Sequence, residues 1–262
     1  MDAISPLLLK DSHEAPADFF ASICWSLICE PGDSFAGLLI SSFGAANALV
    51  LEIEQTSPSK YLSLLREHES SGIERFRSLE KVAADARQRW MPRMNLRQVV
   101  EACQDMARLG GWFVTSEHHA WPERLLDLEN HVPRGLWGLG DHGTLGALSD
   151  AFSFVGSRIS TDYGQNTCLD LIEPLVARGS AIVSGGAYGI DAAAHRAAIA
   201  SGGRTVAMMA GGLDRLYPSG NAELFASITI CGALLSEMPP GAEPTKWRFL
   251  QRNRLIARSE ER

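Results

Sequence analysis

Short apolar runs alternate with segments of helical periodicity throughout the second half of the chain. The last four runs lie at residues 152–155, 181–183, 205–209 and 233–235, and helical patterns at 162–178, 190–201 and 220–231 separate them. Strands that alternate with helices of this length form βαβ units, in which the strands are parallel. The pattern predicts an α/β fold, a Rossmann-like parallel sheet with helices on both faces.

The N-terminal third follows a different pattern. Between residues 19 and 51, apolar residues recur at helical spacing and turn residues break them twice, which predicts two or three short helices. Asp33 or Ser34 would cap the second of these. Residues 54–93 are more polar and predict helices on a solvated surface. We therefore expect a small all-α domain over 1–92 and a Rossmann-like domain over 93–262, which also includes a helix at 95–109 and strands at 112–114 and 136–137.

Composition and charge limit the kind of protein. The 262-residue chain is 45% hydrophobic, which is enough for a folded core, and its net charge of -7 argues against general affinity for nucleic acids. Five scattered cysteines without CxxC spacing indicate neither a zinc site nor a disulfide framework. The chain start lacks the basic region of a signal peptide, and the longest apolar run, 19–29, is too short to cross a bilayer. We expect a cytoplasmic protein with no metal, no cofactor and no membrane span.

The string GLGDHG at 138–143 matches the GxGxxG pattern of dinucleotide-binding turns, and Asp162 lies near the position of a ribose-binding acid. Only about eight residues separate the string from the next predicted strand, whereas a βαβ crossover needs about a dozen or more. The helix that would bind the phosphates has no room to form. A nicotinamide cofactor is therefore not expected.

Three glycine-rich turns follow predicted strands. In open α/β sheets, ligands bind beyond the carboxyl ends of the strands, where glycines allow close backbone approach and free N–H groups attract anions. The turns predict a phosphate-binding rim, and the alternative for the first is a tight turn with a solvent-facing arginine. The candidate residues are Gly156, Ser157 and Arg158 in the first turn, Ser184, Gly185, Gly186, Ala187 and Gly189 in the second, and Gly211, Gly212 and Tyr217 in the third.

Three residues in or near these turns need separate interpretation. A carboxylate at Asp191 would repel a phosphate placed beside it, so we predict that Asp191 is a structural cap of the helix that follows the second turn. His195, one helical turn later, is interpreted as structural. Tyr217 could stack on a base or pack against the protein, and the sequence leaves both possibilities open.

Residues 244–258 form a local basic patch that the net charge of the whole chain conceals. The segment contains Trp247, Phe249 and no acidic residue. Such a patch is typical of a phosphate-binding surface, and the alternative is a solvated helix face. Its basic residues are Lys246, Arg248, Arg252, Arg254 and Arg258.

Five strings resemble the DprA/Smf family of DNA-processing proteins in order and spacing. They are GSR at 156–158, SGGAYGIDAAAHRAA at 184–198, GGLDRLYPSGN at 211–221, SEMPPG at 236–241 and FLQRNRLIA at 249–257. The likeness covers about residues 112–258, and the N-terminal third is similar to the small SAM-like domain of that family. The resemblance implies a protein that binds incoming single-stranded DNA in natural transformation, helps to load the RecA recombinase and catalyses no reaction.

The resemblance also implies a DNA site made of Gly156, Ser157 and Arg158, the turn at 184–189 and the segment Arg252-Asn253-Arg254. Members of the family continue beyond this segment with strands that complete the sheet and supply a dimer surface, whereas this chain stops at Arg262. We therefore expect a chain that is cut short at its C-terminal end, in which the homodimer of the family is doubtful.

Two other functions are compatible with parts of the sequence. Nucleoside-monophosphate phosphoribohydrolases of the LOG type also place glycine turns around a phosphate, but their PGGxGTxxE string has no counterpart with a glutamate at 184–191 or 211–218. The second alternative is a truncated chain with little activity.

Overall fold

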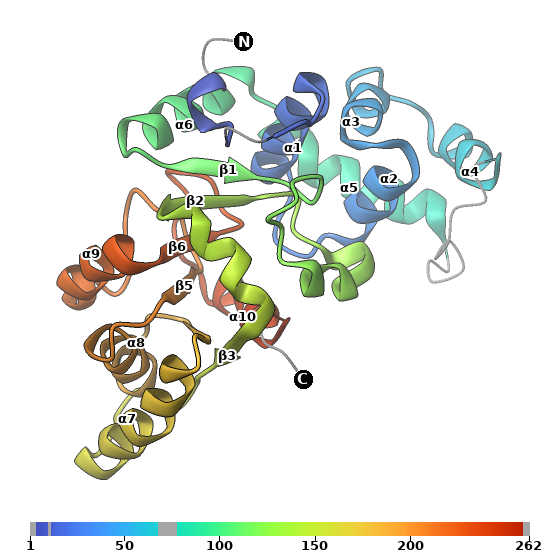
Figure 1. Cartoon of the computed structure of the whole chain (residues 1–262). Coiled ribbons are helices and arrows are strands. Elements are labelled where there is room, and N and C mark those ends of the chain that lie inside the picture. The colour runs from blue at the N-terminus through green and yellow to red at the C-terminus, as the bar shows by residue number, and fades with distance from the viewer. Residues whose placement is uncertain (1–3, 10–11, 68–77, 259–262) are drawn as a thin grey trace.

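The computed structural model describes residues 4–9, 12–67 and 78–258, so the chain end at 259–262, on which the expected truncation rests, lies outside it. A six-stranded mixed sheet with the order β1-β2-β6-β5-β4-β3 forms the centre of the described part (Figure 1). The strands are β1 (Trp112–Val114), β2 (Leu136–Gly140), β3 (Ala151–Ser153), β4 (Ala181–Ser184), β5 (Thr205–Met209) and β6 (Ala233–Ser236). The predicted α/β fold is confirmed, with strands at every predicted position.

The sheet is parallel only in part. Strands β3, β4, β5 and β6 pair in parallel, whereas β2 runs antiparallel to β6 and β1 antiparallel to β2. The predicted parallel pairing therefore holds from β3 to β6, and β1 and β2 add an antiparallel edge to it. The reason lies in the connection from β2 to β3, which contains the 3₁₀ helix η5 (His142–Asp150) and no crossover α-helix. Without a crossover the chain does not return to start β3 in the direction of β2, so β2 runs opposite to the parallel strands. The same arrangement leaves the GLGDHG string on an antiparallel strand, outside any βαβ unit.

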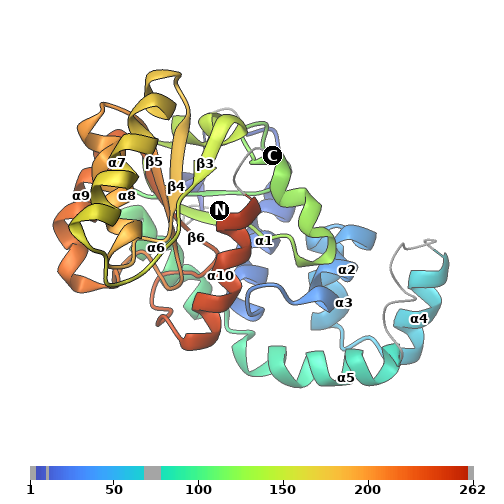
Figure 2. The same ribbon diagram turned by 90° about the horizontal axis from the view of Figure 1, so that it is seen from below.

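Helices cover both faces of the sheet, as predicted. On one face lie α7 (Asp162–Ala177), α8 (Ile190–Ala200) and α9 (Ala222–Cys231), and on the other lies α10 (Lys246–Arg258) (Figures 1 and 2). Because successive side chains of a strand point to opposite faces, each strand contributes to two cores. Ile182 packs in the cluster of α7 and α8, whereas Val183, Val206 and Met208 pack with Leu255 and Ile256 of α10.

The N-terminal region is helical, as predicted. Its helices are α1 (Pro16–Ile28), α2 (Ser34–Phe43), α3 (Ala45–Ile53), α4 (Pro58–Glu67), α5 (Leu79–Trp90) and α6 (Leu96–Arg108). Asp33 caps α2, because its Oδ1 accepts hydrogen bonds from the N–H groups of Phe35 and Ala36, both at 3.2 Å. Residues 68–77, within the stretch predicted as surface helices, lie outside the described residues.

The helical region and the sheet share one hydrophobic core. The Phe19 ring of α1 meets the Phe113 ring of β1 edge to face at 5.7 Å, and the indole N–H of Trp137 in β2 donates to Ser26 Oγ at 3.2 Å. The boundary that we propose near Met91 thus separates two regions that pack tightly together. None of the helices in the described ranges is by itself long and apolar enough to cross a membrane, and α2 and α3, bent by 114° at their junction, reach that length and composition only together.

Candidate nucleic-acid interface

The three glycine-rich turns meet at the carboxyl ends of neighbouring strands. The first turn contacts the second through the N–H of Ile190, which donates to the Ser157 carbonyl at 3.0 Å. The third segment reaches the second through Asn221, whose side-chain amide donates to the Gly186 carbonyl at 3.0 Å. We call this edge, made of residues 155–158, 184–191 and 211–221, the rim.

The first turn of the rim is open to solvent. Gly156, Ser157 and Arg158 are all exposed. A β-carbon on Gly156 would lie 2.7 to 2.9 Å from the Ile190 side chain, so only glycine allows the two turns to approach this closely. Ser157 Oγ donates to the Ile159 carbonyl at 2.8 Å and fixes the turn. Among the ion pairs of the described residues none involves Arg158, which leaves its guanidinium available to a ligand.

The second turn of the rim is closed. Ser184, Gly185 and Gly186 are buried, and Ser184 Oγ donates to the Phe154 carbonyl at 2.6 Å. A β-carbon on Gly185 would lie 2.5 Å from Nη1 of Arg252. The glycines therefore allow close approach, as predicted, but the partner that approaches is the protein itself.

Asp191 does not cap helix α8 in the predicted way. Gly189 is the N-cap residue of α8 and provides no side-chain hydrogen bond. The Asp191 carboxylate, which is 7% exposed, instead accepts a hydrogen bond from the N–H of Ala187 in the preceding turn at 3.4 Å. Burial raises the pKa of Asp191, and the amides of Ala187, Gly185 and Gly156 together with Arg252 act in the opposite direction.

Arg252 faces inward at the centre of the rim. Its side chain is 6% exposed, and its Nη1 donates to the Gly185 carbonyl at 2.8 Å and to the Met208 carbonyl. Burial lowers the pKa of Arg252 to about 10, while the nearby Asp191 carboxylate favours its charged form. The guanidinium therefore joins the ends of β4 and β5 to α10.

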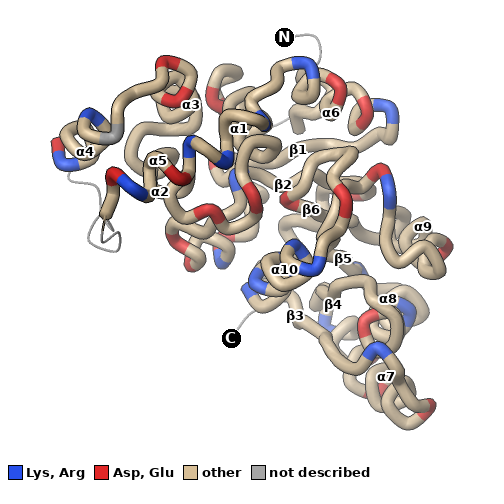
Figure 3. The backbone as a smooth tube through the Cα atoms, turned by 180° about the vertical axis from the view of Figure 1, so that it is seen from behind, with Lys and Arg blue, Asp and Glu red and all other residues tan. Residues whose placement is uncertain are grey.

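Most arginines of the predicted basic patch are neutralised by acidic residues. Figure 3 shows the basic positions gathered along α10. Arg248 pairs with Glu30 at 2.9 Å, Arg254 with Glu237 at 2.6 Å and Arg258 with Asp127 at 3.3 Å. Arg254 also donates to the His131 carbonyl at 3.0 Å, so its guanidinium is occupied by groups of the protein, and Asn253 between the two arginines is exposed. The segment mainly attaches α10 to the rest of the molecule.

Aromatic rings accompany the rim. Tyr217 is 55% exposed, yet its ring meets that of Phe249 at 5.7 Å, so it both packs and offers a face to solvent. Tyr188, next to Gly189 in the second turn, is 49% exposed. Trp247 at the start of α10 is also exposed. These rings can stack on unpaired bases.

His195 lies beneath the rim and is fully buried. Its Nδ1 lies 2.7 Å from Thr205 Oγ1, which donates to the Ile182 carbonyl at 2.9 Å. Burial lowers the pKa of His195 to about 3, so the imidazole is neutral at pH 7. This environment agrees with the structural interpretation of His195.

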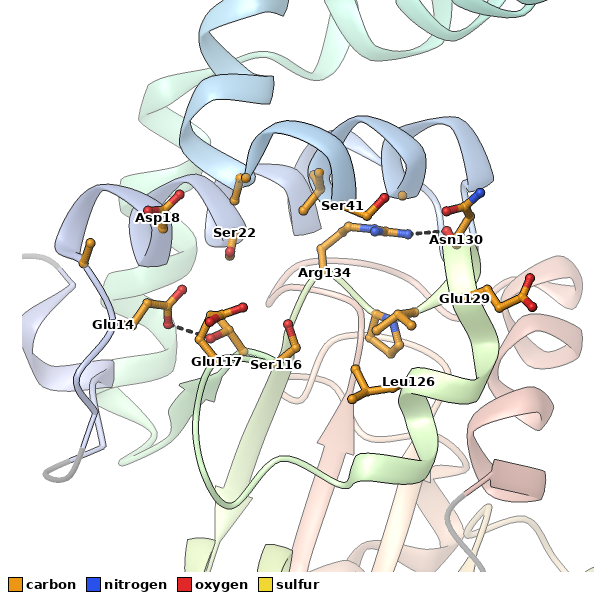
Figure 4. A pocket seen from close by; sticks show the side chains of 18 of the residues that line it. Glu14, Asp18, Ser22, Ser41, Ser116, Glu117, Leu126, Glu129, Asn130 and Arg134 are labelled. Atoms are coloured by element: carbon orange, nitrogen blue, oxygen red, sulfur yellow. Dashed lines mark hydrogen bonds between the residues drawn. The ribbon is translucent and has the colours of Figure 1, made fainter. Parts of the chain in front are cut away.

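A cavity of about 1090 Å³ lies away from the rim, between α1, α2, the segment after β1 and the 3₁₀ helix η4 (Glu123–His131) (Figure 4). Its lining includes none of the predicted site residues. The carboxylates of Glu14, Asp18, Glu117 and Glu129 outnumber the single guanidinium of Arg134. A polyanion would be repelled here, so the rim remains the candidate for nucleic acid.

Comparison with known proteins connects this architecture to one family. The model of the DNA recombination-mediator protein A family matches residues 112–259. The chain belongs to this family. The resemblance to DprA/Smf proteins, which the sequence strings predicted, is thereby confirmed.

Relatives in the family are longer than this chain. It is 41% identical over 174 residues to a putative DNA processing protein DprA of Mycobacterium tuberculosis, and 39% identical over 125 residues to the DNA processing protein DprA of Bacillus subtilis. These matches cover 62% and 48% of this chain but only 45% and 42% of the relatives. The chain thus spans less than half the length of either relative.

A solved structure supports the fold over nearly the whole chain. The DNA processing protein A of Streptococcus pneumoniae aligns with a TM-score of 0.66 at 24% identity, over 94% of this chain and 76% of that one. The alignment includes the helical N-terminal region, which the family model does not reach.

The sequence prediction included Tyr188 only as part of the turn at 184–189 and not as a stacking residue, and it did not anticipate that Arg252 faces inward at the rim. Tyr188 could have been found, because an aromatic residue inside a glycine-rich turn has little room to bury its ring. The direction of Arg252 depends on how α10 docks, which no local pattern specifies, whereas Asp191 contacts Ala187 only four residues before it.

Proposed function

We propose that this chain binds single-stranded DNA along its rim and acts as a DNA-processing protein in natural transformation. The observation that carries the proposal is the exposed, unpaired guanidinium of Arg158 on a turn that lies against the turn of Tyr188. The two turns are in close contact, as Gly189 shows: a β-carbon at this position would lie only 2.7 Å from the Arg158 carbonyl oxygen. A cation beside aromatic faces is what a strand of phosphates and unstacked bases requires.

The same features favour a single strand over a duplex. A duplex keeps its bases stacked on each other, so the exposed faces of Tyr188 and Tyr217 would find no base to contact. The net charge of -7 means that attraction to phosphates is local and not spread over the surface. The names of the relatives, DNA processing proteins, agree with this class of ligand.

Further parts of the proposal concern the cell. Loading of the RecA recombinase and the absence of catalysis are what the DprA/Smf resemblance implies, and a cytoplasmic location is what the cysteine pattern and the chain start predict. The full burial of His195 supports a binding role, because its imidazole does not reach a ligand bound at the rim. The domain boundary near Met91 remains a proposal as well.

Fluorescence anisotropy with labelled oligo-dT tests the proposed site. We expect Arg158→Ala to weaken binding about 10-fold, with a logarithmic salt slope reduced by about 0.7 because one phosphate contact is lost. Arg204→Ala is the matched control, since Arg204 is exposed but precedes β5 at the opposite end of the strands. Equal affinity of the wild type and Arg158→Ala would exclude the rim as the DNA site.

A further inference from the structure

The backbone amides at the centre of the rim already face an anion of the protein itself. In this fold, the N–H groups of the turn before a helix commonly bind the phosphate of a nucleotide. Here the N–H of Ala187 donates to Asp191 Oδ2. The backbone N–H groups of Gly185 and Gly156 also stabilise this carboxylate and, against the effect of burial, act to lower its pKa. We call these three amides the cradle.

Groups of the protein border the cradle on several sides. Arg252 lies against Gly185, the Asn221 side chain donates to the Gly186 carbonyl, and the Ile190 side chain lies against Gly156. Asp191 is the buried carboxylate within this shell, and the charge of the Arg252 guanidinium favours its ionised form. A phosphate that entered would have to displace the carboxylate or tolerate a like charge beside it.

We infer that Asp191 is a resident anion that occupies the phosphate cradle of the fold and thereby excludes mononucleotides and dinucleotides from the rim. The phosphates of a DNA strand then bind outside the cradle, at Arg158. Only this last step rests on the proposed function. The exclusion of free nucleotides follows from the contacts of Asp191 alone.

Anion rescue tests the inference. Asp191→Ala removes the carboxylate and leaves a space of its size, which formate can fill. We expect the melting temperature of this variant to fall by several degrees in sodium chloride and to recover at least half of the loss in sodium formate of equal ionic strength. The wild type and Asp162→Ala, which changes an exposed aspartate in the first turn of α7, should respond equally to the two salts. Equal responses of all three proteins would overturn the inference.

Asp191→Asn keeps the shape of the side chain, removes its charge and covers the case in which Asp191→Ala does not fold. We expect calorimetric titration with adenosine monophosphate to show at least 10-fold tighter binding to Asp191→Asn than to the wild type. Saturable binding of equal strength to both proteins would overturn the inference. Oligo-dT anisotropy on the same samples keeps the two hypotheses apart, because a wild type that fails to bind DNA refutes the proposed function and leaves the nucleotide result intact.

Discussion

The first and second turns of the rim have similar glycine-rich sequences but opposite surroundings. The turn at 156–158 is exposed and presents an unpaired guanidinium, whereas the turn at 184–189 is largely buried and its polar groups are used by Asp191 and Arg252. The comparison shows that glycine in such turns indicates close approach and not the identity of what approaches. One turn is suited to a ligand, and the other is completed by the protein.

The largest expected effect concerns the closed turn. Arg252→Ala should lower the free energy of unfolding by about 3–5 kcal/mol, because it leaves the Asp191 carboxylate without its opposite charge and two strand-end carbonyls without their donor. Urea denaturation measures this loss. The open turn supplies the control, since Arg158→Ala should change the free energy by less than about 0.5 kcal/mol. An Arg252→Ala protein of normal stability would break the comparison.

Gly189 tests how tightly the two turns are joined. Gly189→Ala should cost about 2–4 kcal/mol, because φ at this position is +79° and a β-carbon would lie 2.1 Å from the Ser157 carbonyl oxygen. Gly202→Ala isolates the backbone contribution, since Gly202 has a φ of +72° with no atom within 4 Å of a β-carbon. It should cost about 1 kcal/mol. Equal losses in thermal denaturation would show that the turns can separate freely.

Protonation of His195 in α8 should destabilise the protein at acidic pH. The pKa of this histidine is lowered to about 3 in the folded protein, while an unfolded histidine titrates near 6.5. The unfolded state therefore binds the proton first as the pH falls, and stability that is complete above pH 6.5 is lost toward pH 3. At pH 5 the loss is about 2 kcal/mol. His195→Gln should flatten the dependence of unfolding free energy on pH between 5 and 7. An unchanged slope would mean that water reaches the imidazole and keeps its pKa near that of the unfolded chain.

Tyr188 should affect binding more than folding. Its half-exposed ring lies on the face that the closed turn offers to solvent, so Tyr188→Ala should weaken oligo-dT binding about 5-fold through the loss of about 1 kcal/mol of stacking. Tyr188→Phe retains the ring and should bind as the wild type does. A Tyr188→Phe protein that binds as weakly as Tyr188→Ala would assign the contact to the hydroxyl group.

Local sequence determines more of the fold than of the rim. The apolar runs located every strand and Asp33 identified the start of α2, because these features depend on neighbouring residues. The antiparallel direction of β1 and β2 was not predicted, because it depends on the pairing of β2 with β6, a strand that is distant in the sequence. The ion pairs of the basic patch could not be predicted from local sequence either, since the partner of Arg248 is Glu30, 218 residues away. Composition could reveal five cations, but only the assembled fold shows which of them already have partners.

The contact between Glu30 and Arg248 has a consequence for how the molecule is made. Glu30 leaves the ribosome more than two hundred residues before Arg248, and Arg93, which lies 2.7 Å from it in the folded protein, is the cation available in the meantime. All six strands are also synthesised before α10. Docking of α10 is therefore a late, long-range step of co-translational folding. Until it occurs, part of one apolar face of the nascent sheet stays exposed to chaperones.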